Sequence, residues 1–194
     1  MTGKILCLIP AFNEAAHIKK VVAQASAFLP VLVVDDGSRD DTALLAEQAG
    51  AQVLRQVPNQ GKGAALIAGF KAALQGGYEA VLTLDADGQH DPQEIPKFLE
   101  EARRKPAGLI IGQRDYSQMP LRRRLPNTLG KAFFSWAVGE EILDNQSGYR
   151  LIRSDLLEAM LANPEHGFEF EVAMIVECLK LGLGLGWVPS LRAV

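Results

Sequence analysis

The sequence has few cysteines, no long apolar run and no excess of positive charge. Its 194 residues include two cysteines, Cys7 and Cys178, which lie far apart in apolar stretches. We expect both to pack as small hydrophobic side chains, without a disulfide or a metal. The apolar runs fall short of the roughly 18 residues that a membrane-spanning helix needs, so we expect no such helix. The first residues lack a signal-peptide pattern, which suggests a cytoplasmic location.

The charge balance excludes one class of partner. The formal net charge is -3 and the sequence pI is about 5.7, so no basic field is available for a polynucleotide and we expect no nucleic-acid partner. Hydrophobic residues make up 48% of the chain and charged residues 22%, a balance typical of a globular core. We predict a single catalytic domain over residues 1–194. We also consider a C-terminal truncation, because the chain stops soon after the last predicted strand.

Short apolar strands alternate with helices along the sequence. We predict strands at 5–9, 31–34, 52–56, 80–84 and 109–111, and helices at 14–28, around Leu44 to Ala49, and at 62–74. After residue 112 the order is less regular, with strands predicted at 149–152 and 186–189 and helices at 127–138, 154–161 and 170–181. This alternation predicts an α/β fold, in which helices cover both faces of a mainly parallel central sheet.

Each of the first five predicted strands ends in polar, loop-forming residues. These ends lie at 10–14, 35–38, 59–63, 85–90 and 112–115. Ligands of open α/β sheets bind beyond the carboxyl ends of the strands, so we expect the five ends to form one crevice.

The sharpest of these ends contains Asp85 and Asp87. The two carboxylates are spaced i, i+2 at the rim of an apolar strand and can reach one ion, and Gln89 adds a further oxygen. Hard oxygen ligands suit Mg²⁺ or Mn²⁺, with a diphosphate completing the coordination. Taken alone, the motif is explained equally well by an Asp-Gly turn followed by a helix that starts at Asp91 and Pro92.

Two other strand ends suggest contacts with a nucleotide. Asp35 and Asp36 could accept hydrogen bonds from a nucleoside, although a turn also explains them. Lys62 lies between two glycines without the full P-loop spacing. We expect close backbone packing there at a helix start, with Lys62 near a phosphate. No Gly-x-Gly-x-x-Gly follows the first strand, which argues against a nicotinamide dehydrogenase.

In their order along the chain, these segments resemble family 2 glycosyltransferases of the GT-A fold, and most closely the dolichyl-phosphate mannose synthase-like branch. One such motif would be a weak signal, whereas the ordered set is highly specific. The matching segments are Ile9-Pro10-Ala11-Phe12-Asn13-Glu14, Val33-Val34-Asp35-Asp36-Gly37-Ser38, Asn59-Gln60-Gly61-Lys62-Gly63, Asp85-Ala86-Asp87-Gly88-Gln89-His90 and Ser147-Gly148-Tyr149-Arg150.

The resemblance implies a role for each matching position. Mg²⁺ or Mn²⁺ would be held by Asp85, Asp87 and Gln89. The catalytic residues would be Asp87, Arg114 and Arg150, with both arginines facing donor or acceptor phosphates. The nucleotide-sugar donor, GDP-mannose or a UDP-sugar, would contact Pro10, Ala11, Asn13, Glu14, Asp36, Lys62, Asp85, Ala86 and Ser147.

An acidic pair near the predicted site has two readings. Glu169 and Glu171 match the acidic helix start that the family places near its site. The helix dipole, which favours negative charge in a first turn, explains them equally well.

The implied reaction is metal-dependent, inverting transfer of a hexose to an acceptor, expected to be a polyprenyl or dolichyl phosphate. A phosphate acceptor is already anionic and needs no strong base, whereas a hydroxyl acceptor would need one, first of all Asp87. The arginines at 122–124 precede a segment with several aromatic residues. This combination suits peripheral contact with the inner face of the cell membrane, and it also suits a core-packed helix behind a solvated loop.

Two alternatives stay open at the level of sequence. A sugar-phosphate nucleotidyltransferase uses a similar sheet and metal, but the segment 10–14 replaces the glycine-rich, basic loop that such enzymes usually carry. A non-catalytic nucleotide-sugar-binding module is the other alternative. The sequence does not identify the base, the sugar, the acceptor or the oligomeric state.

Overall fold

The structure is a computed structural model that describes residues 3–113, 135, 138–162 and 170–189. Within these residues, a seven-stranded sheet has the order β3-β2-β1-β4-β6-β5-β7. The strands are β1 (Ile5–Ala11), β2 (Val31–Asp35), β3 (Gln52–Arg55), β4 (Ala80–Thr83), β5 (Leu109–Gln113), β6 (Arg150–Arg153) and β7 (Leu185–Pro189).

The sheet is parallel except at β6, as expected for a mainly parallel sheet. Strand β1 pairs in parallel with β2 and β4, and β5 pairs in parallel with β7. Strand β6 is inserted between β4 and β5 and is antiparallel to both. Its direction follows from its entry point, because the loop before β6 lies beside Asp85 at the carboxyl end of β4.

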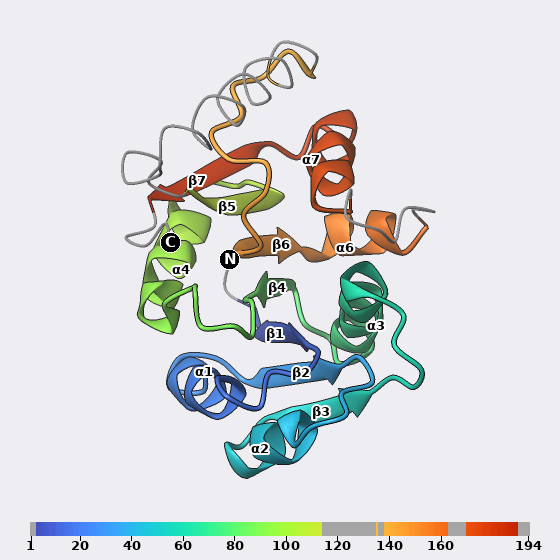
Figure 1. Cartoon of the computed structure of the whole chain (residues 1–194). Helices are drawn as coiled ribbons and strands as arrows, with labels where there is room; N and C mark the ends of the chain where they lie inside the picture. Colours follow the sequence, from blue (N-terminus) through green and yellow to red (C-terminus); the bar gives the residue numbers. More distant parts are fainter. Residues whose placement is uncertain (1–2, 114–134, 136–137, 163–169, 190–194) are drawn as a thin grey trace, which may run out of the picture.

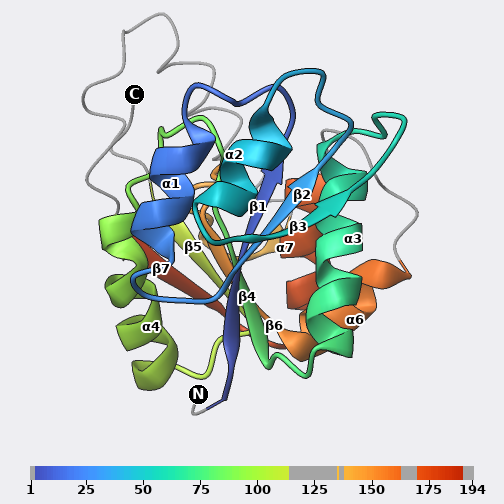
Figure 2. The same ribbon diagram turned by 90° about the horizontal axis from the view of Figure 1, so that it is seen from below.

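Helices cover both faces of the sheet (Figures 1 and 2). One face packs against α1 (Ile18–Ala25), α2 (Thr42–Gln48) and α4 (Ile95–Arg104), and the other against α3 (Lys62–Gln75), α6 (Ser154–Leu161) and α7 (Phe170–Lys180). Alternate strand residues enter the two cores: Cys7 and Ile9 of β1 face the α1 side, and Leu6 and Leu8 face the α3 side. This period of two lets one continuous apolar strand support two helical layers.

Most predicted elements match the structure, with differences at their ends. Helix α1 begins at Ile18, later than the predicted start at residue 14, because residues 15–17 form a turn. Asp91 accepts a hydrogen bond from the backbone of Gln93 and starts a short 3-10 helix, Pro92–Glu94, which leads into α4. Helix α4 was anticipated only through this start. The helix predicted at 127–138 lies largely outside the described residues.

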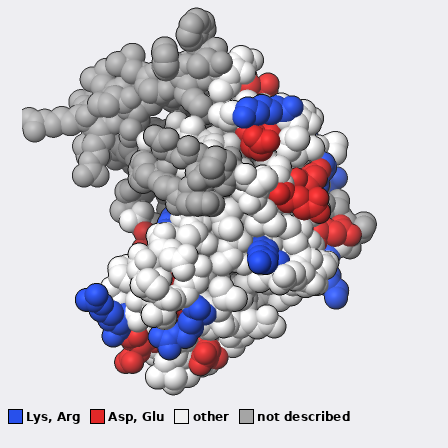
Figure 3. Space-filling model, turned by 90° about the vertical axis from the view of Figure 1, so that its right-hand side faces the viewer, with Lys and Arg blue, Asp and Glu red and all other residues white. Residues whose placement is uncertain are grey.

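Both thiols are buried, as the sequence predicted, and neither forms a disulfide. Burial raises the pKa of Cys7 to about 12 and that of Cys178 to about 11. Within the described part of the chain, no helix is long and apolar enough to cross a membrane. On the face shown in Figure 3, basic and acidic side chains are interspersed among uncharged ones.

Candidate donor-binding site

A cavity of about 260 Å³ opens at the carboxyl ends of β1 and β4. This is the point where the sheet order reverses, since the chain continues from β1 to β2 and β3 on one side and returns to β4 on the other. Open α/β sheets bind their ligands at such a switch point. Among the described residues, those that line the cavity are Pro10, Ala11, Glu14, Asp36, Lys62, Ala65, Asp85, Ala86 and Asp87.

All but one of these lining residues were predicted from the sequence as donor or metal contacts. The exception, Ala65, lies one helical turn after Lys62 and follows from the position of α3. Of the remaining predicted donor contacts, Asn13 and Ser147 are not among the lining residues. The structure therefore brings three strand ends and the start of α3 to one cavity.

Asp36 holds the loop that leads into α3. Its two carboxylate oxygens accept hydrogen bonds from the backbone N–H groups of Gln60, at 2.8 Å, and Gly61, at 2.7 Å. The side-chain amide of Asn59 donates to the Asp36 carbonyl at 2.8 Å. These contacts fix the backbone on which Lys62 begins its helix.

Asn13 joins the first two strand ends. It has a φ of 56°, in the left-handed region that asparagine tolerates better than most residues. Its backbone N–H donates to the Ser38 hydroxyl at 2.9 Å, and its side-chain oxygen accepts from the backbone of Arg39 at 2.9 Å. Asn13 thus shapes the loop beside the cavity, in place of the predicted position in the wall.

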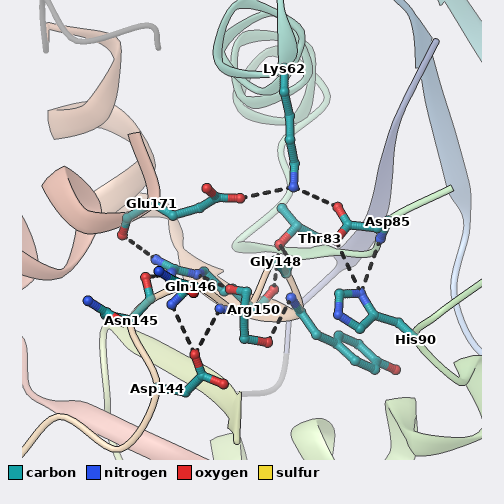
Figure 4. A network of polar contacts seen from close by, with 12 residues as sticks. Lys62, Thr83, Asp85, His90, Asp144, Asn145, Gln146, Gly148, Arg150 and Glu171 are labelled. Atoms are coloured by element: carbon teal, nitrogen blue, oxygen red, sulfur yellow. Dashed lines mark hydrogen bonds and ion pairs between the residues drawn. The ribbon is translucent and has the colours of Figure 1, made fainter. Parts of the chain in front are cut away.

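Lys62 links two acidic side chains from different elements (Figure 4). Its ammonium lies 2.7 Å from Oδ1 of Asp85 and 2.9 Å from Oε1 of Glu171. The three side chains come from α3, from the residues after β4 and from the first turn of α7. Sequence left two readings for Glu171, and the structure places its carboxylate beside a cavity residue.

The pKa values of Lys62 and Asp85 are set mainly by the opposite charges that surround them. Burial alone would lower the pKa of Lys62, but Asp85 and Glu171 outweigh it and raise that pKa. Burial alone would raise the pKa of Asp85, but the ammonium of Lys62, together with His90 and Arg150, holds it below its ordinary value. The lysine and Asp85 are therefore both charged at neutral pH.

Asp85 also rests on a close-packed glycine. A Cβ on Gly148 would lie 2.6 Å and 2.9 Å from the two Asp85 carboxylate oxygens, too close for any real contact. The hydroxyl of Thr83 donates a hydrogen bond to the Gly148 carbonyl at 2.7 Å. Nδ1 of His90 lies 3.6 Å from the second Asp85 oxygen, and the His90 ring packs against Tyr149 with 5.1 Å between centroids.

The two other predicted metal ligands differ in placement. Asp87 lines the cavity, and its Oδ1 accepts the backbone N–H of Gln89 at 2.9 Å across a turn in which Gly88 has a φ of 75°. Gln89 is exposed and is not among the lining residues. No group of three or more His, Cys, Asp or Glu side chains in the described residues is arranged to hold a metal ion. Of the three predicted metal ligands, Asp85 and Asp87 thus line the cavity.

Arg150, which the sequence predicted to contact a phosphate, instead has its guanidinium bonded to backbone carbonyls. Its side chain is buried, and its guanidinium donates to the carbonyls of Ser147 at 2.7 Å, Glu171 at 2.5 Å and Asn145 at 3.1 Å. This arrangement ties the loop before β6 to the start of α7. Ser147 is also buried, where its N–H donates to Asp144 at 3.1 Å.

Two residues singled out in the sequence, Arg114 and Glu169, lie outside the described residues. The same holds for the arginines at 122–124 and most of the aromatic segment that follows them. The role of Gly148 beneath Asp85 was missed from sequence. The only signal for it was its place in the Ser-Gly-Tyr-Arg motif.

The described fold and cavity agree with a comparison against protein families. The sequence profile of Glycosyl transferase family 2 matches residues 7–161, which is most of the chain. The chain belongs to this family and is a glycosyltransferase. Its relatives match the dolichyl-phosphate mannose synthase-like branch that the sequence motifs indicated.

Two curated relatives have similar sequences. The undecaprenyl-phosphate mannosyltransferase of Micrococcus luteus is 32% identical over 201 residues, covering 96% of this chain and 82% of that protein. The polyprenol monophosphomannose synthase of Mycolicibacterium smegmatis is 30% identical over 204 residues, covering 97% of this chain and 77% of that protein.

A solved structure shows the same fold. The glucosyl-3-phosphoglycerate synthase of Mycobacterium tuberculosis, in complex with Mn²⁺, UDP and glucosyl-3-phosphoglycerate, superposes with a TM-score of 0.77. The match covers 99% of this chain and 72% of that chain at 22% identity. The likeness establishes the GT-A fold for this chain, as predicted.

Proposed function

We propose that this glycosyltransferase moves a hexose, with inversion, from a nucleoside diphosphate sugar to a polyprenyl phosphate. The observation that carries the proposal is the single cavity that joins Asp36, Lys62, Asp85 and Asp87 at the switch point of the sheet. The names of two relatives, a mannosyltransferase and a mannose synthase acting on polyprenyl lipids, support the sugar and acceptor classes. A structural neighbour that contains Mn²⁺ and UDP supports the donor class.

The residues of the cavity fit a divalent cation. Asp85 and Asp87 both line the cavity, and Asp85 already forms an ion pair with the ammonium of Lys62. A bound Mg²⁺ or Mn²⁺ would be held by this pair and would supply positive charge to the leaving diphosphate. Gln89 would complete the set only by turning inward from its exposed position.

The chain's own residues would orient the two substrates. In this proposal Asp36 contacts the nucleoside and Lys62 contacts a phosphate, which is supported by the position of both residues in the cavity lining. In this proposal Arg114 positions the acceptor phosphate, since the Arg150 guanidinium is engaged with backbone carbonyls. An anionic lipid phosphate attacks the anomeric carbon of the donor without a strong base. To reach such a lipid, the protein contacts the membrane surface from the cytoplasmic side.

The test is hexose transfer from radiolabelled donor to polyprenyl phosphate in detergent with Mn²⁺. We expect the wild-type protein to form a lipid-linked sugar and Asp87→Asn to lose at least about 100-fold in rate, because a carboxylate at the reaction centre is lost. Glu47→Gln, which makes the same chemical change on the exposed side of α2, is the matched control. The melting temperatures of both variants should match the wild type.

Three outcomes would overturn the proposal. Full activity of Asp87→Asn with metal bound would remove Asp87 from the site. Release of pyrophosphate from a sugar phosphate and a nucleoside triphosphate would indicate a nucleotidyltransferase. Donor binding without transfer to any polyprenyl phosphate would indicate a non-catalytic module.

A further inference from the structure

Lys62 has a position that donor binding alone does not explain. Its ammonium contacts the same Asp85 carboxylate that would hold the metal, at 2.7 Å. The lysine side chain remains 45% exposed, whereas the side chains of Asp85 and Glu171 are 26% and 16% exposed. The lysine side chain is therefore the most exposed of the three, and its ammonium lies between the two carboxylates (Figure 4).

A divalent ion and the ammonium compete for Asp85. A divalent metal held by Asp85 would bind a carboxylate oxygen directly. An ammonium within hydrogen-bond distance of the same oxygen would then face a like charge at close range, which is unfavourable. Metal can therefore bind Asp85 at full strength only when Lys62 leaves it.

Glu171 keeps the displaced ammonium close by. It holds Lys62 at 2.9 Å, and its own backbone carbonyl is fixed by Arg150 at 2.5 Å. Lys62 can thus leave Asp85 without losing its second partner. The diphosphate of a donor offers new acceptors at the same place, because both Lys62 and Asp85 line the cavity.

We propose that Lys62 is the resident cation of the unloaded site: it neutralises Asp85 until metal and diphosphate arrive together, and then moves to the diphosphate. The inference rests on the proposed donor class and extends it to the order of loading. It makes metal binding and nucleotide binding interdependent, since each ligand removes the obstacle to the other. Glu171 acts in this scheme as a positioning residue for Lys62.

The test measures Mn²⁺ affinity by electron paramagnetic resonance, in the absence of nucleotide and then with GDP or UDP. We expect Lys62→Met to bind Mn²⁺ alone at least about fivefold more tightly than wild type, because the competing cation is gone. With saturating Mn²⁺, the same variant should bind the nucleoside diphosphate at least about fivefold more weakly, because the phosphate has lost a cationic partner. The coupling between the two ligands should fall accordingly.

Two further variants control the experiment. Lys71→Met removes the same charge from an exposed position on the same helix, and it should leave both affinities within about twofold of wild type. Lys62→Arg retains the charge and should keep Mn²⁺ binding as weak as in wild type. Thermal unfolding checks the fold of each variant, and Lys62→Gln replaces the methionine variant if that one is unfolded.

The outcomes separate this inference from the proposed function. If wild type binds Mn²⁺ with GDP or UDP but Lys62→Met binds Mn²⁺ alone no more tightly than Lys71→Met, the resident-cation role is wrong while the donor site stands. If the wild type binds neither metal nor nucleotide, both the inference and the proposed function are wrong.

Discussion

Gly148 lies directly against the Asp85 carboxylate and leaves no room for a side chain. The carboxylate cannot move away freely, because Lys62 holds one oxygen and His90 lies near the other. Thr83 holds the glycine in place through a hydrogen bond to the Gly148 carbonyl. The position of the Asp85 carboxylate therefore depends on the absence of a side chain at residue 148.

Replacing Gly148 by alanine should displace Asp85. The added Cβ would lie 2.6 Å from a carboxylate oxygen, so we expect donor affinity with Mn²⁺ to fall at least about tenfold through misplacement of the ligand. Calorimetry of donor binding checks this. Gly186→Ala on β7, whose Cβ would meet Ile110 of β5 at 3.0 Å, controls for a packing defect away from the cavity. Equal affinity losses in the two variants would contradict the assignment.

Residue type and order predicted most of the cavity, whereas contact partners could not be predicted. Asp85 and Asp87 were predictable because carboxylates that follow an apolar parallel strand lie at the carboxyl ends of the strands, where ligands bind. Arg150 was assigned to a phosphate from its motif alone. Its three carbonyl partners depend on where the loop at 145–147 and helix α7 meet, which is information that local sequence does not contain.

At the level of elements, the start of α3 brings a charged side chain, Lys62, to the cavity. The helix begins at Lys62 after Gly61, which has a φ of 92°, and Asp36 supplies acceptors for the backbone just before it. Since Asp36 is itself at the end of β2, the sheet and the helix are joined at the cavity. A change in Asp36 should therefore affect both stability and binding.

Asp36→Asn tests this double role. An amide has one oxygen and a donor group in place of two acceptors, so one N–H of Gln60 or Gly61 loses its partner. We expect a loss of about 2 kcal/mol in the free energy of unfolding, measured with urea, together with weaker donor binding. Asp41→Asn, at an exposed helix cap without a side-chain hydrogen bond, should change neither quantity. Weaker binding with unchanged stability would show that Asp36 serves the nucleoside alone.

Element type was easier to predict than direction. The apolar residues of β6 match those of the parallel strands, and an apolar run does not record which way a strand runs. Helix α4 has a clear face with Ile95, Phe98 and Ala102 buried, but the sequence indicated only its start, at Asp91 and Pro92, as part of the turn reading of the Asp85 motif. The two readings of the Asp85–Asp87 motif, as a turn before a helix and as part of a site, are compatible. Asp87 lines the cavity, and Asp91 begins the short helix that leads into α4.

Across the whole molecule, the topology explains why distant segments share one site. The order β2-β1-β4 places the ends of the first, second and fourth strands side by side, and α3 closes the cavity from one face. The antiparallel β6 then brings its preceding loop under Asp85 and, through Arg150, the start of α7. Family membership agrees with this arrangement. The profile match spans residues 7–161 and therefore includes every described residue that lines the cavity, from Pro10 to Asp87.

The most direct test that this cavity is a metal-dependent donor site is calorimetric titration with GDP-mannose, UDP-glucose and UDP-GlcNAc, each with and without Mn²⁺. We expect one of these donors to bind at micromolar concentration only when Mn²⁺ is present, and this binding to disappear in Asp85→Asn. Binding that is independent of Mn²⁺ and unchanged in Asp85→Asn, or no binding of any donor, would contradict the assignment of the cavity.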